Sequence, residues 1–461
     1  MSYQDFIARK LADWTPCGFD YTGKLGGGLF EHQDALVRWA LRLGRAAIFA
    51  DTGLGKTRMT VKWADVVSRH CKGRVLILAP LAVAQQTVEE AASIGVAVTH
   101  AREPEDIGYA RLVITNYDRL HKFDTSGFIG VVLDESSIIK HHDTKTLAHL
   151  LRAFRDTPYR LCATATPAPN DWTELGTHAE FLGICTQAEM LSEYFVHDGG
   201  ETQVWRLKGH ARQAFWRWVS SWGAMIRSPA DLGFDASGYD LPPLHLKQIT
   251  VDTDAQANEG MLFALEASSL SERRQARKDS LAHRVAACAA EVNASDEPWI
   301  VWCELNAEAD ALRAAIPGAV EVRGSDKAEH KERVFHDFAH GNVRVLITKP
   351  KIAGFGLNWQ HCRRVAFVGV TDSFESYYQA VRRCWRFGQT RPVKVYLYVS
   401  ALEGSVMSNL QRKERDAVAM FESLSAETRD AVRAAVRGSS RNTNDYRATK
   451  RVQVPAFLEV S

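Results

Sequence analysis

Short apolar runs bounded by turn residues alternate with longer stretches of helical periodicity between about residue 30 and residue 170. Five runs have the length and composition of buried strands: AAIFA at 46–50, VLILAP at 75–80, RLVITN at 111–116, VVLDE at 131–135 and RLCATAT at 160–166. Fully apolar strands separated by helices are typical of a parallel sheet with both faces covered. The pattern therefore predicts an α/β domain in this half of the chain.

The same alternation returns in the second half of the chain. Its strand candidates are WIVWCE at 299–304, AVEVRG at 319–324, VRVLITK at 343–349, RVAFVG at 364–369 and VKVYLYV at 393–399. They predict a second parallel-sheet domain in tandem with the first. The stretch from about 171 to 295 lacks this alternation and indicates mainly helices. Within it, YDLPPLHLKQITVD contains Pro242 and Pro243, which indicate a linker.

Composition narrows the class of protein only slightly. The chain has 461 residues, a formal net charge of +2 and 46% hydrophobic residues, which suits a soluble protein of two or three domains. With so little net charge, a site for a polyanion has to come from local clustering of basic residues. Eight cysteines without a C-x-x-C pair argue against a zinc ribbon or a disulfide framework and favour the cytoplasm. The N-terminus lacks the apolar core of a signal peptide, and the longest apolar run, 75–84, is too short to span a bilayer, so we expect neither secretion nor membrane insertion.

A glycine-rich loop, DTGLGKT at 51–57, follows the first predicted strand and precedes a helical segment. Such a turn points backbone N–H groups at a phosphate chain, and the helix N-terminus adds its dipole. Lys56 would reach the β- and γ-phosphates, Thr57 would bind Mg²⁺, and the glycines would allow a close approach of the backbone. The predicted nucleotide contacts here are Thr52, Gly53, Leu54, Gly55, Lys56 and Thr57. An unrelated loop of similar composition is the alternative.

An acidic strand end, VVLDESS at 131–137, supplies the partner of this loop. Three apolar residues place Asp134 and Glu135 at the carboxyl end of a strand, where open α/β sheets bind their ligands. Asp134 suits coordination of Mg²⁺, and Glu135 suits activation of the attacking water. A strand that ends in Asp-Glu is also a common solvated strand end. After a phosphate loop and two intervening strands, however, it is the expected Walker B element, and the pair predicts an Mg²⁺-dependent NTPase.

Six further segments follow one another in a characteristic order. They are LFEHQDALVRWAL at 29–41, APLAVAQQ at 79–86, ITNYDRL at 114–120, ATATPAPN at 163–170, ITKPKIAGFGLNWQHC at 347–362 and QAVRRCWRFGQT at 379–390. With the phosphate loop and the acidic strand end, this series resembles the Swi/Snf-like branch of superfamily 2 helicases and translocases, in its compact phage or bacterial form. The last segment, which fits Q-x-x-x-R-x-x-R-x-G-Q, is the most specific single match. The resemblance covers about residues 28 to 400 and implies two RecA-like domains.

The resemblance implies roles for residues of both domains. Gln33 would read the adenine edge, and Gln379 would add a polar contact to the nucleotide. Arg383 and Arg386 would stabilise the γ-phosphate when the second domain closes on the first. Because they lie three residues apart, we expect them to share one face of a helix. The alternative is that these arginines only solvate a helix, and the neighbouring Arg382 receives no role.

The resemblance also implies a nucleic-acid track across both domains. Its motifs touch the phosphate backbone rather than base edges, which predicts little sequence specificity and a marked dependence on salt. The candidate contacts are Thr115, Thr166, Thr348 and Asn358. One departure concerns Ser137, which replaces the histidine that normally contacts the 163–170 segment. Coupling between the ATP site and the track would then need another group.

An aromatic stretch at 204–227 allows two interpretations. Phe215, Trp218, Val219 and Trp222 have the spacing of a buried helix face. Trp216 and the interleaved arginines and lysine would then be exposed and could form a stacking, phosphate-binding surface.

These features predict a nucleic-acid-stimulated ATPase, and more specifically an ATP-dependent DNA helicase or double-stranded DNA translocase. ATP and Mg²⁺ would occupy the cleft, duplex or forked DNA would be the partner, and the compartment would be the cytoplasm, or that of the host for a phage protein. An RNA-directed helicase and a non-catalytic nucleic-acid clamp or scaffold that retains the fold remain alternatives. The expected segments are an N-terminal extension at 1–28, a first RecA-like domain at 29–175, a helical insertion or linker at 176–245, a second RecA-like domain at 246–403, and a helical tail with a mobile C-terminus at 404–461.

Overall fold

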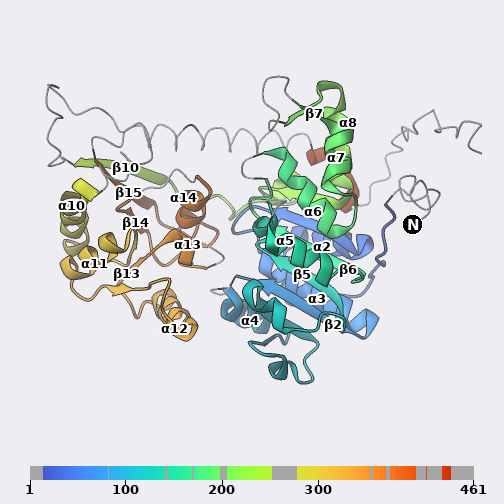
Figure 1. Cartoon of the computed structure of the whole chain (residues 1–461), viewed down its shortest axis with the longest axis horizontal. Helices are drawn as coiled ribbons and strands as arrows, with labels where there is room; N and C mark the ends of the chain where they lie inside the picture. The colour runs from blue at the N-terminus through green and yellow to red at the C-terminus, as the bar shows by residue number, and fades with distance from the viewer. Residues whose placement is uncertain are drawn as a thin grey trace, which may run out of the picture.

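The computed structural model shows two lobes, each built on a parallel sheet (Figure 1). The structure describes residues 14–80, 83–140, 144–168, 171–197, 205–251, 278–353, 357–369, 374–400, 412 and 428–437. Helices cover both faces of each sheet, which confirms the predicted fold class of two α/β domains in tandem. Within these ranges, no helix combines the length and the apolar character that a membrane crossing requires.

The first lobe contains a seven-stranded sheet in which the paired strands run parallel. In spatial order its strands are β3 (Thr99–His100), β4 (Leu112–Asn116), β2 (Arg74–Ala79), β5 (Phe128–Asp134), β6 (Tyr159–Thr164), β1 (Arg45–Ala50) and β9 (Gly223–Ile226). Alternate residues of β1 point to opposite faces of the sheet and pack into two hydrophobic cores. Ala46, Ile48 and Ala50 pack on the side of α2 (Glu31–Leu43), α3 (Lys56–Cys71) and α4 (Ala84–Ser93). Ala47 and Phe49 pack on the side of α5 (Lys145–Ala153), α6 (Leu175–Leu182), α7 (Gln187–Tyr194) and α8 (Arg212–Trp222).

The second lobe contains a six-stranded parallel sheet. In spatial order its strands are β10 (Leu244–Val251), β15 (Val393–Ser400), β14 (Arg364–Phe367), β11 (Trp299–Trp302), β13 (Val345–Thr348) and β12 (Val320–Glu321). One face packs on α10 (Leu281–Asn293) and α11 (Asn306–Ala315). The other packs on α12 (Ala328–Ala339), α13 (Pro350–Ala353) and α14 (Phe374–Val381). Because all strands run in one direction, their carboxyl ends meet at one edge, which is where this architecture places ligands.

Shorter elements complete the description. A small antiparallel sheet consists of β7 (Phe195–His197) and β8 (Trp205–Leu207). The 3₁₀ helices are η2 (Pro104–Ile107), η3 (Tyr117–Lys122), η4 (Ser136–Ile139), η5 (Trp172–Glu174), η6 (Gly209–Ala211) and η7 (Pro229–Leu232). Helical residues 428–437 dock on the first lobe, where Val432 and Val436 enter the core and Arg429 lies 3.3 Å from Asp231. The remainder of the predicted helical tail and the C-terminus predicted to be mobile lie outside the described residues.

All ten apolar runs form strands, but five strands were not predicted: β3, β7, β8, β9 and β10. β9 lies in the stretch interpreted as mainly helical and pairs with β1 of the first sheet. It is only four residues long and follows α8 directly, so the helical pattern masks it. β10 begins at Leu244, directly after the two prolines that indicate a linker, and pairs with β15 along its whole length. Most side chains of β10 are exposed at the edge of the sheet, and therefore no continuous apolar run marks it.

The aromatic stretch forms α8, and its inward face includes one residue more than predicted. Phe215, Val219 and Trp222 are buried, and Trp218 is half-buried, as the spacing indicates. Trp216, which we expected on the surface, is also buried, because its ring packs edge-on against Trp172 at 4.8 Å. Trp216 is therefore not available for stacking on a base.

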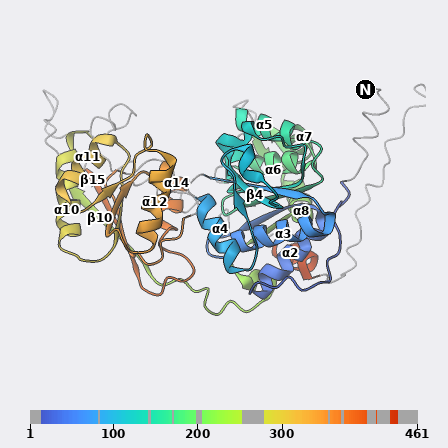
Figure 2. The ribbon, with the colours of Figure 1, turned by 90° about the horizontal axis from the view of Figure 1, so that it is seen from below.

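The two lobes contact each other through polar side chains. Figure 2 shows α4 of the first lobe facing α12 and α14 of the second. Arg102 forms ion pairs across this gap with Glu329 at 3.1 Å and Glu332 at 2.5 Å. Ion pairs with this exposure to water contribute little to stability. Arg102 therefore adds little to the cohesion of the two lobes.

A buried ion pair of the second lobe gives a test of the fold. Arg284 of α10 and Glu308 of α11 are both fully buried and lie 2.8 Å apart. Arg284 also bonds the carbonyl oxygen of Val368, so it ties both helices to the end of β14. Arg284→Met leaves the Glu308 carboxylate buried without its cation. We expect the free energy of unfolding of this lobe to fall by about 3–5 kcal/mol in guanidinium titrations followed by tryptophan fluorescence.

The matched control is Arg313→Met, which removes an exposed arginine of α11. It should change the free energy of unfolding by no more than about 0.5 kcal/mol. Equal effects of the two substitutions would contradict a special role for the buried pair.

Candidate active site

A narrow cleft between the lobes collects most of the residues predicted to act on a nucleotide. It is formed by the carboxyl ends of β1 and β5 and by the chain that follows α14. Its lining consists of Thr52, Gly53, Gly55, Lys56, Thr57, Val83, Gln86, Glu90, Asp134, Glu135, Asn358, Arg383 and Arg386. Side chains separated by more than 300 residues in the sequence thus share one site.

The phosphate loop is the turn between the end of β1 at Ala50 and the start of α3 at Lys56. Gly53 and Gly55 have φ angles of +91° and +78°, a region that favours glycine. A Cβ atom on Gly53 would come within 2.8 Å of the Cβ atom of Phe387, so the second lobe needs this glycine to approach the loop. The Lys56 Nζ donates to the carbonyl oxygens of Ala50 at 2.7 Å and Asp51 at 3.2 Å.

The Lys56 ammonium is buried, and burial lowers its pKa, while the nearby carboxylates of Glu135 and Asp51 act in the opposite direction. Its N–H groups are occupied by backbone oxygens of the loop. A phosphate chain that exchanged with these oxygens would offer the ammonium full negative charges instead of dipoles, which makes stronger hydrogen bonds.

Gln33 lies directly beneath the phosphate loop. Its Nε2 donates to the carbonyl oxygen of Leu54 at 3.0 Å, and its Oε1 accepts the backbone N–H of Phe30 at 3.1 Å. The amide therefore joins the loop to the start of α2, which is a structural function that the sequence did not indicate. Its contact with adenine stays a prediction.

The acidic pair lies at the end of β5, opposite Lys56. Burial raises the pKa of Asp134 to about 7, Glu135 adds to this shift, and Lys56 opposes it. Glu135 has a φ angle of +53°, which is uncommon for a residue other than glycine and marks a constrained turn. Its Oε2 accepts a hydrogen bond of 3.3 Å from the Thr164 hydroxyl at the end of β6.

The second lobe contributes two arginines to the cleft. Arg383 and Arg386 both donate to the carbonyl oxygen of Leu357, at 3.3 Å and 3.2 Å. Burial lowers the pKa of Arg386 to about 10, and the like charge of Arg383 adds to this. The expectation of a shared helix face is wrong, because α14 ends at Val381 and the arginines lie in the turns that follow. Arg383 is buried and Arg386 half-buried, and two guanidinium groups this close together suit an anion.

Comparison with known families agrees with this arrangement. Residues 32–221 match the family described as SNF2-related domain, and residues 283–388 match the helicase conserved C-terminal domain. The order of the two matches is the order of the two lobes. The chain belongs to the Swi/Snf-like branch of superfamily 2.

Curated relatives share parts of this Swi/Snf-like chain. The bifunctional helicase and thymine dioxygenase JBP2 of Leishmania braziliensis is 28% identical over 127 residues, which are 27% of the chain and 11% of the relative. The proteins of the same name from Leishmania tarentolae and Leishmania infantum are 32% identical over 94 residues and 29% identical over 101 residues, each 9% of the relative. The chain thus matches about a tenth of the length of these relatives.

The four predicted nucleic-acid contacts differ in their exposure in this Swi/Snf-like protein. Thr115 is fully buried inside the first sheet, and Thr348 is buried and donates to the carbonyl oxygen of Val322 at 3.0 Å. Neither hydroxyl offers a surface to a nucleic acid here. Thr166 and Asn358 are half-buried and face the gap between the lobes. Parts of the predicted motifs, residues 81–82, 169–170 and 354–356, lie outside the described residues.

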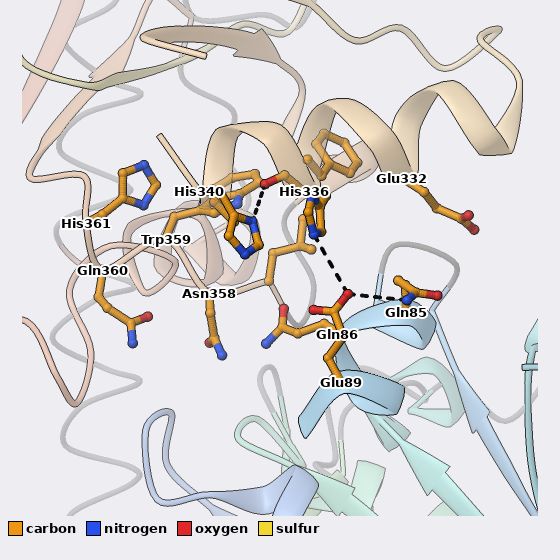
Figure 3. A pocket seen from close by; sticks show the side chains of 13 residues that line it. Gln85, Gln86, Glu89, Glu332, His336, His340, Asn358, Trp359, Gln360 and His361 are labelled. Atoms are coloured by element: carbon orange, nitrogen blue, oxygen red, sulfur yellow. Dashed lines mark hydrogen bonds and ion pairs between the residues drawn. The ribbon is translucent and has the colours of Figure 1, made fainter. Parts of the chain in front are cut away.

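A second polar cavity adjoins the cleft, as Figure 3 shows. It has a volume of about 360 Å³ and lies between α4, α12 and residues 357–361. His336 of α12 lies 3.9 Å from the Glu89 carboxylate of α4, which in turn accepts a hydrogen bond of 3.3 Å from Gln85. Polar groups of both lobes therefore line the interface beyond the nucleotide residues.

Two contacts at the site could not be predicted from the sequence. The first joins the Asp51 carboxylate to Tyr378 and to Arg382, the arginine that received no role. The partners of the longer of these contacts are 331 residues apart, and no spacing rule connects them. The second joins Ser136, the residue after Glu135, to His178 of α6 at 3.1 Å.

The contact between Ser136 and His178 is fully buried. The His178 Nδ1 lies 3.4 Å from the carbonyl oxygen of Glu174, and its Nε2 lies 3.1 Å from the Ser136 hydroxyl oxygen. A neutral imidazole thereby anchors the turn that holds Glu135.

This neutral histidine predicts a loss of stability in acid. Burial lowers the pKa of His178 to about 4, against about 6.5 in an unfolded chain. Between these values the unfolded chain binds more protons than the folded one, so stability falls as the pH falls from about 6.5 to about 4. We expect a contribution of about 3 kcal/mol, measured by urea unfolding across this range.

Carboxylates also titrate in this range, so the measurement compares the wild type with His178→Gln. The glutamine Oε1 can still accept from Ser136 but does not titrate. The variant should lose less stability between pH 6.5 and pH 4 than the wild type, and parallel curves would contradict the assignment.

Proposed function

We propose that this protein is a nucleic-acid-stimulated ATPase that acts as a DNA helicase or double-stranded DNA translocase. One observation supports this above the others. Lys56, Asp134 and Glu135 of the first lobe line the same buried cleft as Arg383 and Arg386 of the second. Phosphoryl transfer depends on positioning and on charge stabilisation, and these residues supply both only when the lobes are together.

The residues of the cleft fit Mg²⁺-ATP. The site offers the Thr57 hydroxyl and the Asp134 carboxylate, and Mg²⁺ is usually held by one or two carboxylates together with substrate phosphates. In the described ranges no cluster of three or more His, Cys, Asp or Glu side chains is arranged to hold a metal by itself. Bound Mg²⁺ would neutralise charge on the phosphate oxygens.

Side chains of the cleft would carry out the other tasks of the reaction. Glu135, which Thr164 holds, would orient a water molecule and accept its proton. Lys56 would hold the β- and γ-phosphates, and Arg383 and Arg386 would stabilise the charge on the transferred group. Lys56 and the acidic pair stand on the first lobe and the two arginines on the second, as a reaction that follows closure requires.

The cleft as it stands leaves about 50 Å³ of open space, far below the roughly 300 Å³ or more of a small-molecule site. Entry of a nucleotide therefore requires the lobes to separate, and their return would bring the arginines onto the γ-phosphate. Such opening and closing, coupled to alternating grip on a nucleic acid, would produce movement. The series of Swi/Snf-like motifs favours DNA over RNA as the track.

ATP hydrolysis by the purified protein tests this function. We expect duplex or forked DNA to raise the turnover severalfold over protein alone, and added salt to suppress the stimulation because the contacts are to phosphates. The assay compares no nucleic acid, single-stranded, duplex and forked DNA, and RNA at two salt concentrations. Stimulation by RNA alone would support the RNA-directed alternative, and no hydrolysis in any condition would support a non-catalytic clamp.

Two substitutions test the assigned chemistry. Lys56→Ala should abolish hydrolysis, because the phosphates lose their cation. Arg386→Ala should lower kcat by about 10³-fold or more with a smaller effect on ATP binding, since an arginine of this kind acts mainly in the transition state. Steady-state kinetics and binding of a fluorescent ATP analogue separate the two effects.

Arg391→Ala is the control, since it removes an exposed arginine five residues further along the same segment. It should retain the wild-type kcat. Unchanged turnover in Lys56→Ala and Arg386→Ala would exclude the proposed mechanism.

A further inference from the structure

The second lobe touches the phosphate loop at one charged residue, Asp51. The Asp51 Oδ1 accepts a hydrogen bond of 3.0 Å from the Tyr378 hydroxyl, and its Oδ2 lies 3.3 Å from the Arg382 Nη2. From its own lobe, Oδ1 also accepts the backbone N–H of Thr52 at 2.6 Å. Groups from both lobes therefore share one carboxylate.

The contact is largely buried and borders a pocket of about 580 Å³. Asp51 and Arg382 are 9% and 8% exposed, and the Arg382 guanidinium lies over the rings of Tyr378 at 5.0 Å and Trp385 at 4.6 Å. Burial alone would raise the pKa of Asp51, but Arg382, the Thr52 N–H and Lys56 outweigh it and hold the pKa below its ordinary value. A buried pair of this kind is costly to leave half-made, so it favours one relative position of the lobes.

Asp51 is also the residue through which such a contact can act on the loop. Its backbone N–H donates to Ile226 of β9 at 3.0 Å, and its carbonyl oxygen accepts from the Lys56 Nζ at 3.2 Å. The residue therefore joins the sheet, the phosphate loop and the catalytic lysine. A shift of its carboxylate is transmitted to all three through short covalent and hydrogen-bonded links.

In the second lobe, Arg382 directly precedes Arg383 and lies four residues before Arg386. A fixed Arg382 thus determines where the two γ-phosphate arginines stand relative to the loop. Separation of the lobes removes both second-lobe partners from Asp51 and leaves Arg382 without its carboxylate, so the contact forms only on closure.

We propose that Asp51, Tyr378 and Arg382 form a closing contact that sets the register of the second lobe on the phosphate loop and thereby positions Arg383 and Arg386. The inference rests on the proposed ATPase function and deepens it. The three residues are positioning residues, because they act through the arginines and the loop. Their loss should lower kcat far more than it weakens binding of ATP.

The test is a double-mutant cycle on stimulated ATP hydrolysis with Asp51→Asn, Arg382→Gln and the combined variant. Each single variant should lower kcat by about tenfold and change the Kd of a fluorescent ATP analogue by less than about threefold. The combined variant should be no slower than the slower single variant, because both remove one link. Multiplied losses, or an unchanged kcat in both single variants, would overturn the proposal.

Two further variants separate positioning from folding. Tyr378→Phe removes only the hydroxyl and should lower kcat by a smaller factor of about two to five with an unchanged melting temperature. Arg364→Gln breaks an ion pair of 2.5 Å with Glu297 inside the second lobe and should keep the wild-type kcat. A kcat loss in the Arg364 variant as large as in Arg382→Gln would show that any ion pair of this lobe has the same effect.

Small-angle X-ray scattering measures the closure of the two lobes independently of ATP hydrolysis. With a non-hydrolysable ATP analogue the wild type should become more compact than Asp51→Asn or Arg382→Gln at equal occupancy, and equal compaction would overturn the closing contact. A wild type that compacts but does not hydrolyse ATP would instead contradict the proposed function and leave the closing contact supported.

Discussion

Buried charges of both signs have to be brought together from two lobes, and the rest of the structure depends on this requirement. Lys56, Asp134 and Glu135 stand on one side of the cleft, and Arg383 and Arg386 stand on the other. A buried charge without a partner costs several kcal/mol. The carboxylate of Glu135 opposes the lowering of the pKa of both Lys56 and Arg386 by burial. Closure of the lobes therefore brings Arg386 to carboxylates of the first lobe, and a triphosphate would add negative charge to this balance.

The sheet of the first lobe fixes the positions of the acidic residues Asp134 and Glu135. β6 lies between β1 and β5 in the strand order, so its end lies between the phosphate loop and the acidic pair. Thr164 is the last residue of β6 and pairs in register with Phe49 of β1, while Asp134 pairs with Ala163. The hydroxyl that holds Glu135 thus comes from the one strand that neighbours both loops. Parallel register therefore sets the distance between Glu135 and the loop at 51–57.

The sequence predicts the parts of the molecule that local patterns encode. Ten apolar runs mark ten strands, and Lys56, Asp134 and Arg386 are recognisable because their motifs combine a strand end or turn with fixed spacing. What escaped prediction depends on tertiary contacts. β10 is an exposed edge strand with no apolar run, Trp216 is buried by Trp172 from another segment, and Gln33 is held by the loop above it. The partners of Asp51 lie more than 300 residues away, and only the fold brings them together.

Ser137 stands where the family has a histidine, and contacts between the lobes show which other groups can connect the cleft to the second lobe. A chain of hydrogen bonds runs from Glu135 to the Thr164 hydroxyl at 3.3 Å, from there to the Thr166 N–H at 3.2 Å, and from the Thr166 hydroxyl to Gln379 at 3.5 Å. The last of these bonds, between Thr166 and Gln379, is long and only partly buried, and is therefore weak. The pair of Asp51 and Arg382 is the opposite case, because it joins two largely buried charges that separate only when both are hydrated again. The two links together join the residues of the cleft to the second lobe, and neither uses a histidine at the position of Ser137.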